Sequence, residues 1–127
     1  MAPASLLIVV DEFAALAKEM PEFVDKVIDI AARGCSLGIH LIMATQRPSG
    51  VIGDNIKANT NLKIALRVAD FQDSRDILGV DSAAHISKTT LGRGFVKVGT
   101  KTPKEFQSAY IGYNLTDEES SNIQVFN

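Results

Sequence analysis

Five consecutive apolar residues followed at once by two carboxylates limit the possible folds of this chain more than any other feature. Residues 6–10 read LLIVV, a run rich in β-branched side chains. Such a run predicts a strand covered on both faces, as in a parallel sheet flanked by helices. Asp11 and Glu12 follow at the carboxyl end of this strand, which is the edge of an open α/β sheet where ligands bind.

The rest of the chain continues the alternation of strand and helix. Helical spacing or capping predicts helices over 13–20, 21–33, 54–59, 71–78 and 81–86, and apolar runs predict strands over 39–44, 62–68, 94–98 and 106–111. The last two strands are separated by a turn with glycine and proline, which is typical of an antiparallel pair. The order predicts an α/β fold with a mostly parallel sheet and a C-terminal antiparallel strand pair.

Composition excludes several classes of protein. The chain has 127 residues, 46% of them hydrophobic and 22% charged, which is ordinary for one globular domain. A net charge of −2 excludes a basic footprint over the whole domain, although it leaves a local basic patch open. The single cysteine, Cys35, excludes an internal disulfide. No apolar run approaches the roughly 20 residues of a membrane span, so we expect a soluble, cytosolic domain.

The carboxylate pair after the first strand suits phosphate chemistry. An aspartate at this position can hold Mg²⁺, usually through water, as in the Walker B arrangement of nucleotide hydrolases. A glutamate one residue later can orient or deprotonate the attacking water. The alternative is that the strand ends in acidic residues only because the following loop is solvated. The residues alone do not favour either interpretation.

Two further polar groups could act on a nucleotide. Gln46 and Arg47 follow the second apolar strand, where an amide and a guanidinium could sense a terminal phosphate. Arg75 lies in a predicted short helix and could act as an arginine finger on a neighbouring subunit's nucleotide. An ordinary strand exit and a solvated surface arginine are the competing interpretations.

A phosphate-binding loop is missing from the sequence. No Gly-x-x-x-x-Gly-Lys-Ser/Thr string occurs, nor any Gly-Lys dipeptide. That loop supplies the backbone N–H groups and the lysine that hold phosphates. Without it, Asp11 and Glu12 would repel a bare triphosphate.

Several strings together resemble the second half of an FtsK/SpoIIIE-family motor ATPase domain. They are LLIVVDEFAAL (6–16), SLGIHLIMATQRPSG (36–50), IKANTNLKIALRV (56–68), DSRDILG (73–79) and LGRGFVKVG (91–99). The resemblance extends from about residue 5 to residue 113, and the blocks keep the family's order. It implies a RecA-like P-loop NTPase fold, ATP and Mg²⁺ as cofactors, and a homo-oligomeric ring, commonly a hexamer.

The resemblance also implies roles for individual residues. Asp11 corresponds to the Walker B aspartate that holds Mg²⁺, and Glu12 to the catalytic glutamate. Gln46 falls at the sensor position, and we expect Arg47 beside it to contact the nucleotide. Arg75 is expected to act across the subunit interface, with Arg67 as the alternative.

The family's Walker A strand and loop should precede residue 1. We therefore expect residues 1–4 to be a linking or added segment, 5–113 the C-terminal part of the ATPase domain, and 114–127 a polar, acidic tail. The Walker A strand of RecA-like sheets lies next to the sensor strand, so its absence predicts a gap or an exposed edge. We expect this chain not to hydrolyse ATP unaided. Self-association, rearrangement or another chain, such as the N-terminal half of the domain, should cover the gap.

Three functions are compatible with the sequence. The string EFQSAYIG (105–112) looks more like the motors of type VII protein secretion than like DNA translocases. The stretch 49–60 has one cation, Lys57, and no aromatic residue to stack on bases, which also favours a secreted protein over DNA as substrate. A DNA translocase and a non-hydrolysing docking or regulatory module are the alternatives. The longer protein is expected to be anchored at the inner face of the cell membrane.

Overall fold

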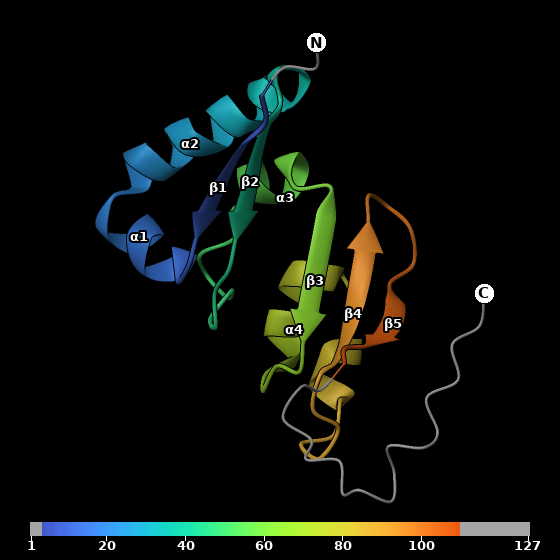
Figure 1. Cartoon of the computed structure of the whole chain (residues 1–127). Helices are drawn as coiled ribbons and strands as arrows, with labels where there is room; N and C mark the ends of the chain where they lie inside the picture. The colour runs from blue at the N-terminus through green and yellow to red at the C-terminus, as the bar shows by residue number, and fades with distance from the viewer. Residues whose placement is uncertain (1–3, 110–127) are drawn as a thin grey trace, which may run out of the picture.

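The computed structural model describes residues 4–109, which form five strands, four α-helices and two short 3₁₀ helices (Figure 1). In chain order these are β1 (Leu6–Val10), α1 (Phe13–Glu19), α2 (Pro21–Gly34), η1 (Cys35–Leu37), β2 (Ile39–Met43), α3 (Asp54–Asn59), β3 (Leu62–Leu66), α4 (Phe71–Leu78), η2 (Ser82–His85), β4 (Arg93–Val98) and β5 (Lys104–Gln107). None of the described helices is both long and apolar enough to cross a membrane. The predicted tail 114–127 lies outside the described residues.

The first two strands form the predicted parallel pair. β1 and β2 run in register from Leu6 opposite Ile39 to Val10 opposite Met43. α1 and α2 make the crossover that a parallel pair requires. Pro21 begins α2, where its missing N–H costs no helical hydrogen bond. This confirms the parallel α/β unit that the sequence predicts.

The third strand departs from the predicted arrangement. β3 does not join the parallel pair but lies antiparallel to β4, which in turn pairs with β5. The predicted C-terminal strand pair is therefore an antiparallel trio. The last predicted strand is shorter than expected, since β5 ends at Gln107; residues 110 and 111 of that prediction lie outside the described part.

Each sheet has its own small core on one face. Phe13, Val24, Ile28 and Ile56 are buried between α1, α2, α3 and the first sheet. Ala65, Leu78 and Ala83 are buried between the second sheet, α4 and η2. Burial of these side chains is the main force that fixes the helices on the two sheets.

The two sheets are separated between β2 and β3. Two cavities of about 130 and 400 Å³ open there, lined by residues of both strands such as Met43 and Leu62. We call this space the slot. Figure 1 shows β2 and β3 as neighbours without a strand between them. The gap that the sequence predicts beside the sensor strand is present.

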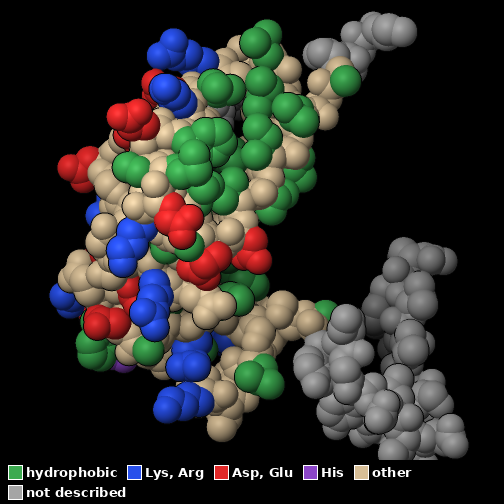
Figure 2. All heavy atoms as spheres, turned by 90° about the vertical axis from the view of Figure 1, so that its left-hand side faces the viewer, with side chains coloured by type: hydrophobic (Ala, Val, Ile, Leu, Met, Phe, Trp, Pro, Cys, Tyr) green, Lys and Arg blue, Asp and Glu red, His purple; other side chains and the backbone are tan. Residues whose placement is uncertain are grey.

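The opposite face of both sheets carries exposed apolar side chains. Val9 is 61% exposed and Ile42 is 50% exposed on the first sheet, and Ile64 is 56% exposed on the second. The expectation that β1 is covered on both faces is wrong for the described chain, because the described helices cover one face only. Seen from the side of α1 and α2, hydrophobic side chains gather over the upper part of the molecule (Figure 2).

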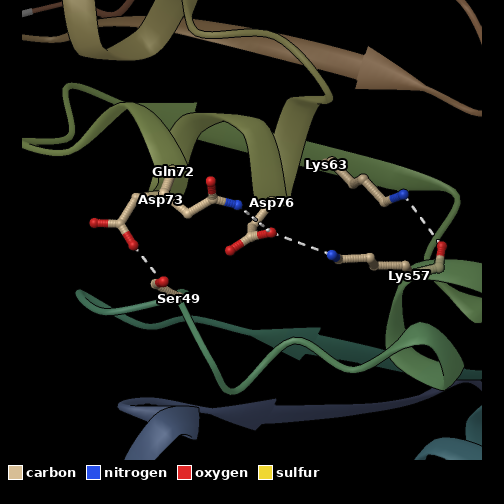
Figure 3. A network of polar contacts seen from close by, with 6 residues as sticks. All are labelled: Ser49, Lys57, Lys63, Gln72, Asp73 and Asp76. Atoms are coloured by element: carbon tan, nitrogen blue, oxygen red, sulfur yellow. Dashed lines mark hydrogen bonds and ion pairs between the residues drawn. The ribbon is translucent and has the colours of Figure 1, made fainter.

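Polar contacts connect the chain between β2 and β3 to α4 (Figure 3). The Ser49 N–H donates to Oδ1 of Asp73 at 3.1 Å, and Nζ of Lys57 lies 3.2 Å from Oδ1 of Asp76. Ser49 and Lys57 belong to the chain between β2 and β3, and both aspartates to α4. This network connects the loop after β2 to the helix of the second sheet.

Candidate functional site

Asp11 and Glu12 lie at the turn between β1 and α1. Glu12 has φ 50° and ψ 49°, and it is the one non-glycine residue with positive φ among residues 4–109. Its N–H donates to Oδ1 of Asp11 at 2.9 Å, and the Phe13 N–H donates to the Ala44 carbonyl at 2.8 Å. A left-handed conformation of a side-chain-bearing residue is costly and is characteristic of functional sites. The turn therefore presents both carboxylates at the carboxyl end of the sheet, where both are exposed.

The loop after β2 meets the glutamate directly. The parallel register places residue 45 opposite residue 12, since β1 and β2 pair with an offset of 33. The Thr45 hydroxyl donates to Oε1 of Glu12 at 3.2 Å and accepts the Arg47 N–H at 3.2 Å. The carboxylate pair and the predicted sensor loop are thus one continuous site.

Gln46 and Arg47 are both exposed beside this contact. Arg47 lines an open groove of about 550 Å³ together with Glu12 and Lys18 of α1. Two cations and one carboxylate at the rim of a groove suit an anionic ligand. The structure brings four of the five predicted site residues to this end of the sheet.

The donors present fit a magnesium ion held mainly by water and phosphate. Among residues 4–109 no group of three His, Cys, Asp or Glu side chains could enclose a metal. Asp11 accepts one N–H on Oδ1, and its exposed carboxylate keeps other lone pairs for a hydrated ion. Mg²⁺ usually keeps several waters and takes one or two carboxylates plus substrate phosphates. Asp11 is therefore suited to that role, and to no closed metal cage.

Arg75 lies apart from these four residues. It belongs to α4, and its Nη2 is 3.5 Å from Oδ2 of Asp81 within the second half of the molecule. Its side chain is 58% exposed, so the ion pair is weak. The guanidinium is accessible from outside this chain. Arg67, the alternative, is exposed after β3.

A lysine beside the slot has an altered pKa. Burial lowers the pKa of Lys63 from its ordinary value of 10.5, and the positive charges of Lys97 and Lys57 lower it further. Nζ of Lys63 donates to the Lys57 carbonyl at 3.1 Å, near the C-terminal end of α3. This contact gives the partly buried ammonium a backbone acceptor.

The sequence predicts no role for Thr45, and it does not predict that Lys18 lines the groove. The parallel register could have identified Thr45, because an offset of 33 between the two strands already pairs it with Glu12. Lys18 carried no signal, since an exposed lysine in an amphipathic helix is ordinary. The contacts of Asp73 and Asp76 with the loop after β2 depend on tertiary packing that no local pattern reports.

Comparison with known proteins identifies long relatives of this chain. It is 46% identical over 121 residues to the type VII secretion system protein EssC of Staphylococcus aureus, covering 94% of this chain and 8% of EssC. It is 45% identical over 114 residues to the ESX secretion system protein YukB of Bacillus subtilis, again 8% of that protein. The chain thus spans less than a tenth of these relatives' length. No family model matches it.

Solved structures also show similarity to a type VII secretion protein. The cytoplasmic domain of the type VII secretion ATPase EccC of Thermomonospora curvata superposes with a TM-score of 0.78 and 31% identity, over 94% of this chain and 14% of that one. The pCW3 conjugation coupling protein TcpA, in its monomer form with ATPγS, gives 0.62 and 29%, over 82% and 32%. This chain is therefore homologous to a segment of the type VII secretion ATPases, and its fold fits a motor domain of the FtsK/SpoIIIE type.

Proposed function

We propose that this chain supplies the Walker B half of a nucleotide site in an ATP-driven motor of type VII-like protein secretion. One observation carries the proposal. The parallel register of β1 and β2 places Asp11 and Glu12 against the loop that holds Gln46 and Arg47. Likeness to a secretion ATPase and to a coupling protein solved with ATPγS supports a nucleotide at this position.

Each residue has a distinct task in this proposal. Asp11 would hold Mg²⁺, and the bound ion would neutralise negative charge on the phosphates. Glu12 orients the attacking water and accepts its proton. Gln46 senses the terminal phosphate by hydrogen bonding, and Arg47 by charge. Both side chains are exposed, so either can turn toward a ligand at this edge.

The phosphate loop comes, in this proposal, from polypeptide outside these 127 residues. A strand leading into that loop would enter the slot and pair with β2 on one side and β3 on the other. Its side chains would extend both sheet faces, and accompanying helices would cover exposed residues such as Val9 and Ile64. The same proposal places Arg75 at the interface with a ring neighbour, because its side chain is largely exposed.

A secreted protein is the substrate we favour over DNA. The single cation of the stretch 49–60, Lys57, pairs with Asp76 and so is not free for a DNA phosphate. The relatives EssC and YukB carry secretion names. TcpA, a conjugation coupling protein, keeps a DNA-linked function as the second candidate. The solved part of EccC is a cytoplasmic domain, and we infer the same side of a membrane for this segment in a membrane-anchored motor.

Calorimetric titration with Mg-ATP tests the proposal. The 127-residue chain should give no binding heat, whereas a version extended upstream through a Gly-Lys-Ser/Thr loop should bind. In the extended form, Glu12→Gln should preserve binding and remove turnover. Tight binding of Mg-ATP by the short chain would contradict the split site. An extended form that binds no nucleotide would favour the docking module.

ATPase rates of the full-length protein separate the two substrates. Stimulation by a secreted substrate protein, with no response to double-stranded DNA, is the expected result. Stimulation by DNA alone would favour the translocase. The salt dependence of any DNA response distinguishes specific stimulation from weak phosphate attraction.

A further inference from the structure

The Thr45 hydroxyl lies between the carboxylate of Glu12 and the backbone of Arg47. Its oxygen is 3.2 Å from Oε1 of Glu12 and 3.2 Å from the Arg47 nitrogen. An ionised carboxylate can only accept a hydrogen bond, and a backbone N–H can only donate one. The hydroxyl proton must therefore point at Glu12, while a lone pair receives the Arg47 N–H. Both contacts together fix the direction of the hydroxyl.

The hydrogen bonds that hold the backbone around Glu12 do not reach its carboxylate, which is held by the contact with Thr45. Its left-handed conformation is held by the Asp11 carboxylate and by the Phe13 N–H bonded to Ala44. The side chain itself is exposed and has three rotatable torsions. Among the described residues, Thr45 is the one side chain that bonds to the carboxylate. A free glutamate side chain loses about 1.5–2 kcal/mol of rotamer entropy when it is ordered, so an anchoring hydroxyl matters.

We propose that Thr45 is a positioning residue. Its hydroxyl holds the Glu12 carboxylate in the orientation that activates water, and links that orientation to the loop containing Gln46 and Arg47. A phosphate that moves this loop would thereby move the carboxylate. The inference rests on the proposed function, since it takes Glu12 as the group that acts on water.

Kinetics of the full-length protein test the inference. Thr45→Val removes the hydroxyl and keeps the branched shape, and Thr45→Ser keeps the hydroxyl. We expect Thr45→Val to lower kcat by about 10- to 100-fold, the range that misplacement of a catalytic group causes. The nucleotide dissociation constant should change less than about threefold, and Thr45→Ser should restore most of kcat.

A second readout does not depend on turnover. In the nucleotide-free protein, exchange of the Arg47 amide should be faster in Thr45→Val than in wild type, and Thr45→Ser should retain the slow rate. A general loss of fold would accelerate many amides, including that of Ala44, which bonds to Val10. Unchanged or raised kcat in Thr45→Val would overturn the inference, as would equal losses in both variants.

A control separates this inference from the proposed function. If Glu12→Gln abolishes turnover while Thr45→Val leaves it unchanged, the role of Thr45 is wrong and that of Glu12 stands. If Glu12→Gln retains full turnover, the proposed function itself is wrong, whatever Thr45→Val does.

Discussion

Replacing Glu12 by glycine should give a more stable protein than replacing it by alanine. Both variants lose the carboxylate and its hydrogen bonds, so the comparison isolates the backbone. At φ 50° and ψ 49°, a residue with a Cβ costs about 1–2 kcal/mol, which glycine avoids. Greater freedom of glycine in the unfolded chain offsets about 0.4–1 kcal/mol. The net advantage of Glu12→Gly over Glu12→Ala is about 1 kcal/mol.

Urea denaturation of the 127-residue chain, followed by circular dichroism, measures the difference. With an m-value of about 1–2 kcal/mol/M, the midpoint of Glu12→Gly should lie roughly 0.5–1 M above that of Glu12→Ala. Both variants are compared at one protein concentration, so that any self-association affects them equally. Lys26, exposed in the middle of α2, is the matched control. The free energy of unfolding of Lys26→Gly should be about 1 kcal/mol lower than that of Lys26→Ala. If the urea midpoint of Glu12→Ala equals or exceeds that of Glu12→Gly, the backbone of Glu12 is not strained and the reasoning fails.

Three further predictions concern stability and association. Asp76→Ala should lower the free energy of unfolding by about 1–2 kcal/mol in urea denaturation, because it leaves Lys57 without its partner at 3.2 Å. Burial lowers the pKa of Lys63, so the unfolded chain binds its proton more strongly than the folded chain does. The free energy of unfolding of wild type, relative to that of Lys63→Met, should therefore rise with pH between the lowered pKa and 10.5. Denaturation at pH 7 and at pH 10 measures this change. A wild-type advantage that falls over this interval would contradict the pKa direction. Ile64→Lys should weaken self-association of the 127-residue chain, measured by sedimentation velocity. Leu91→Lys also replaces an exposed apolar residue, 71% exposed, by a charged one, and it should leave self-association unchanged.

The parallel half of the fold follows from local sequence. The apolar runs at residues 6–10 and 39–44 specify two strands, and the helical spacing between them specifies a crossover that forces parallel pairing. The carboxyl ends of such a pair coincide, which is why the sequence alone predicts that Asp11, Glu12, Gln46 and Arg47 lie together. Family resemblance added the gap beside the second strand.

The second half shows where sequence reasoning ends. The apolar run at 62–66 is typical of a strand in a parallel sheet. Which strand it pairs with depends on which neighbouring strand has an unpaired edge, and local sequence does not report this. With no strand in the slot, β3 pairs only with β4 among the described strands, in antiparallel orientation. The left-handed backbone of Glu12 was equally hidden, because glutamate carries no local signal for that conformation.

Amide hydrogen exchange on β2 and β3 tests the central claim most directly. The experiment compares the 127-residue chain with the version extended upstream through the phosphate loop. If a strand fills the slot, amides of Ile39–Met43 and Leu62–Leu66 that β1 and β4 leave unbonded should become strongly protected in the extended form. Amides within β5, remote from the slot, should change little. Equal exchange on β2 and β3 in both forms, in an extended protein that still binds Mg-ATP, would contradict the proposed division of the nucleotide site.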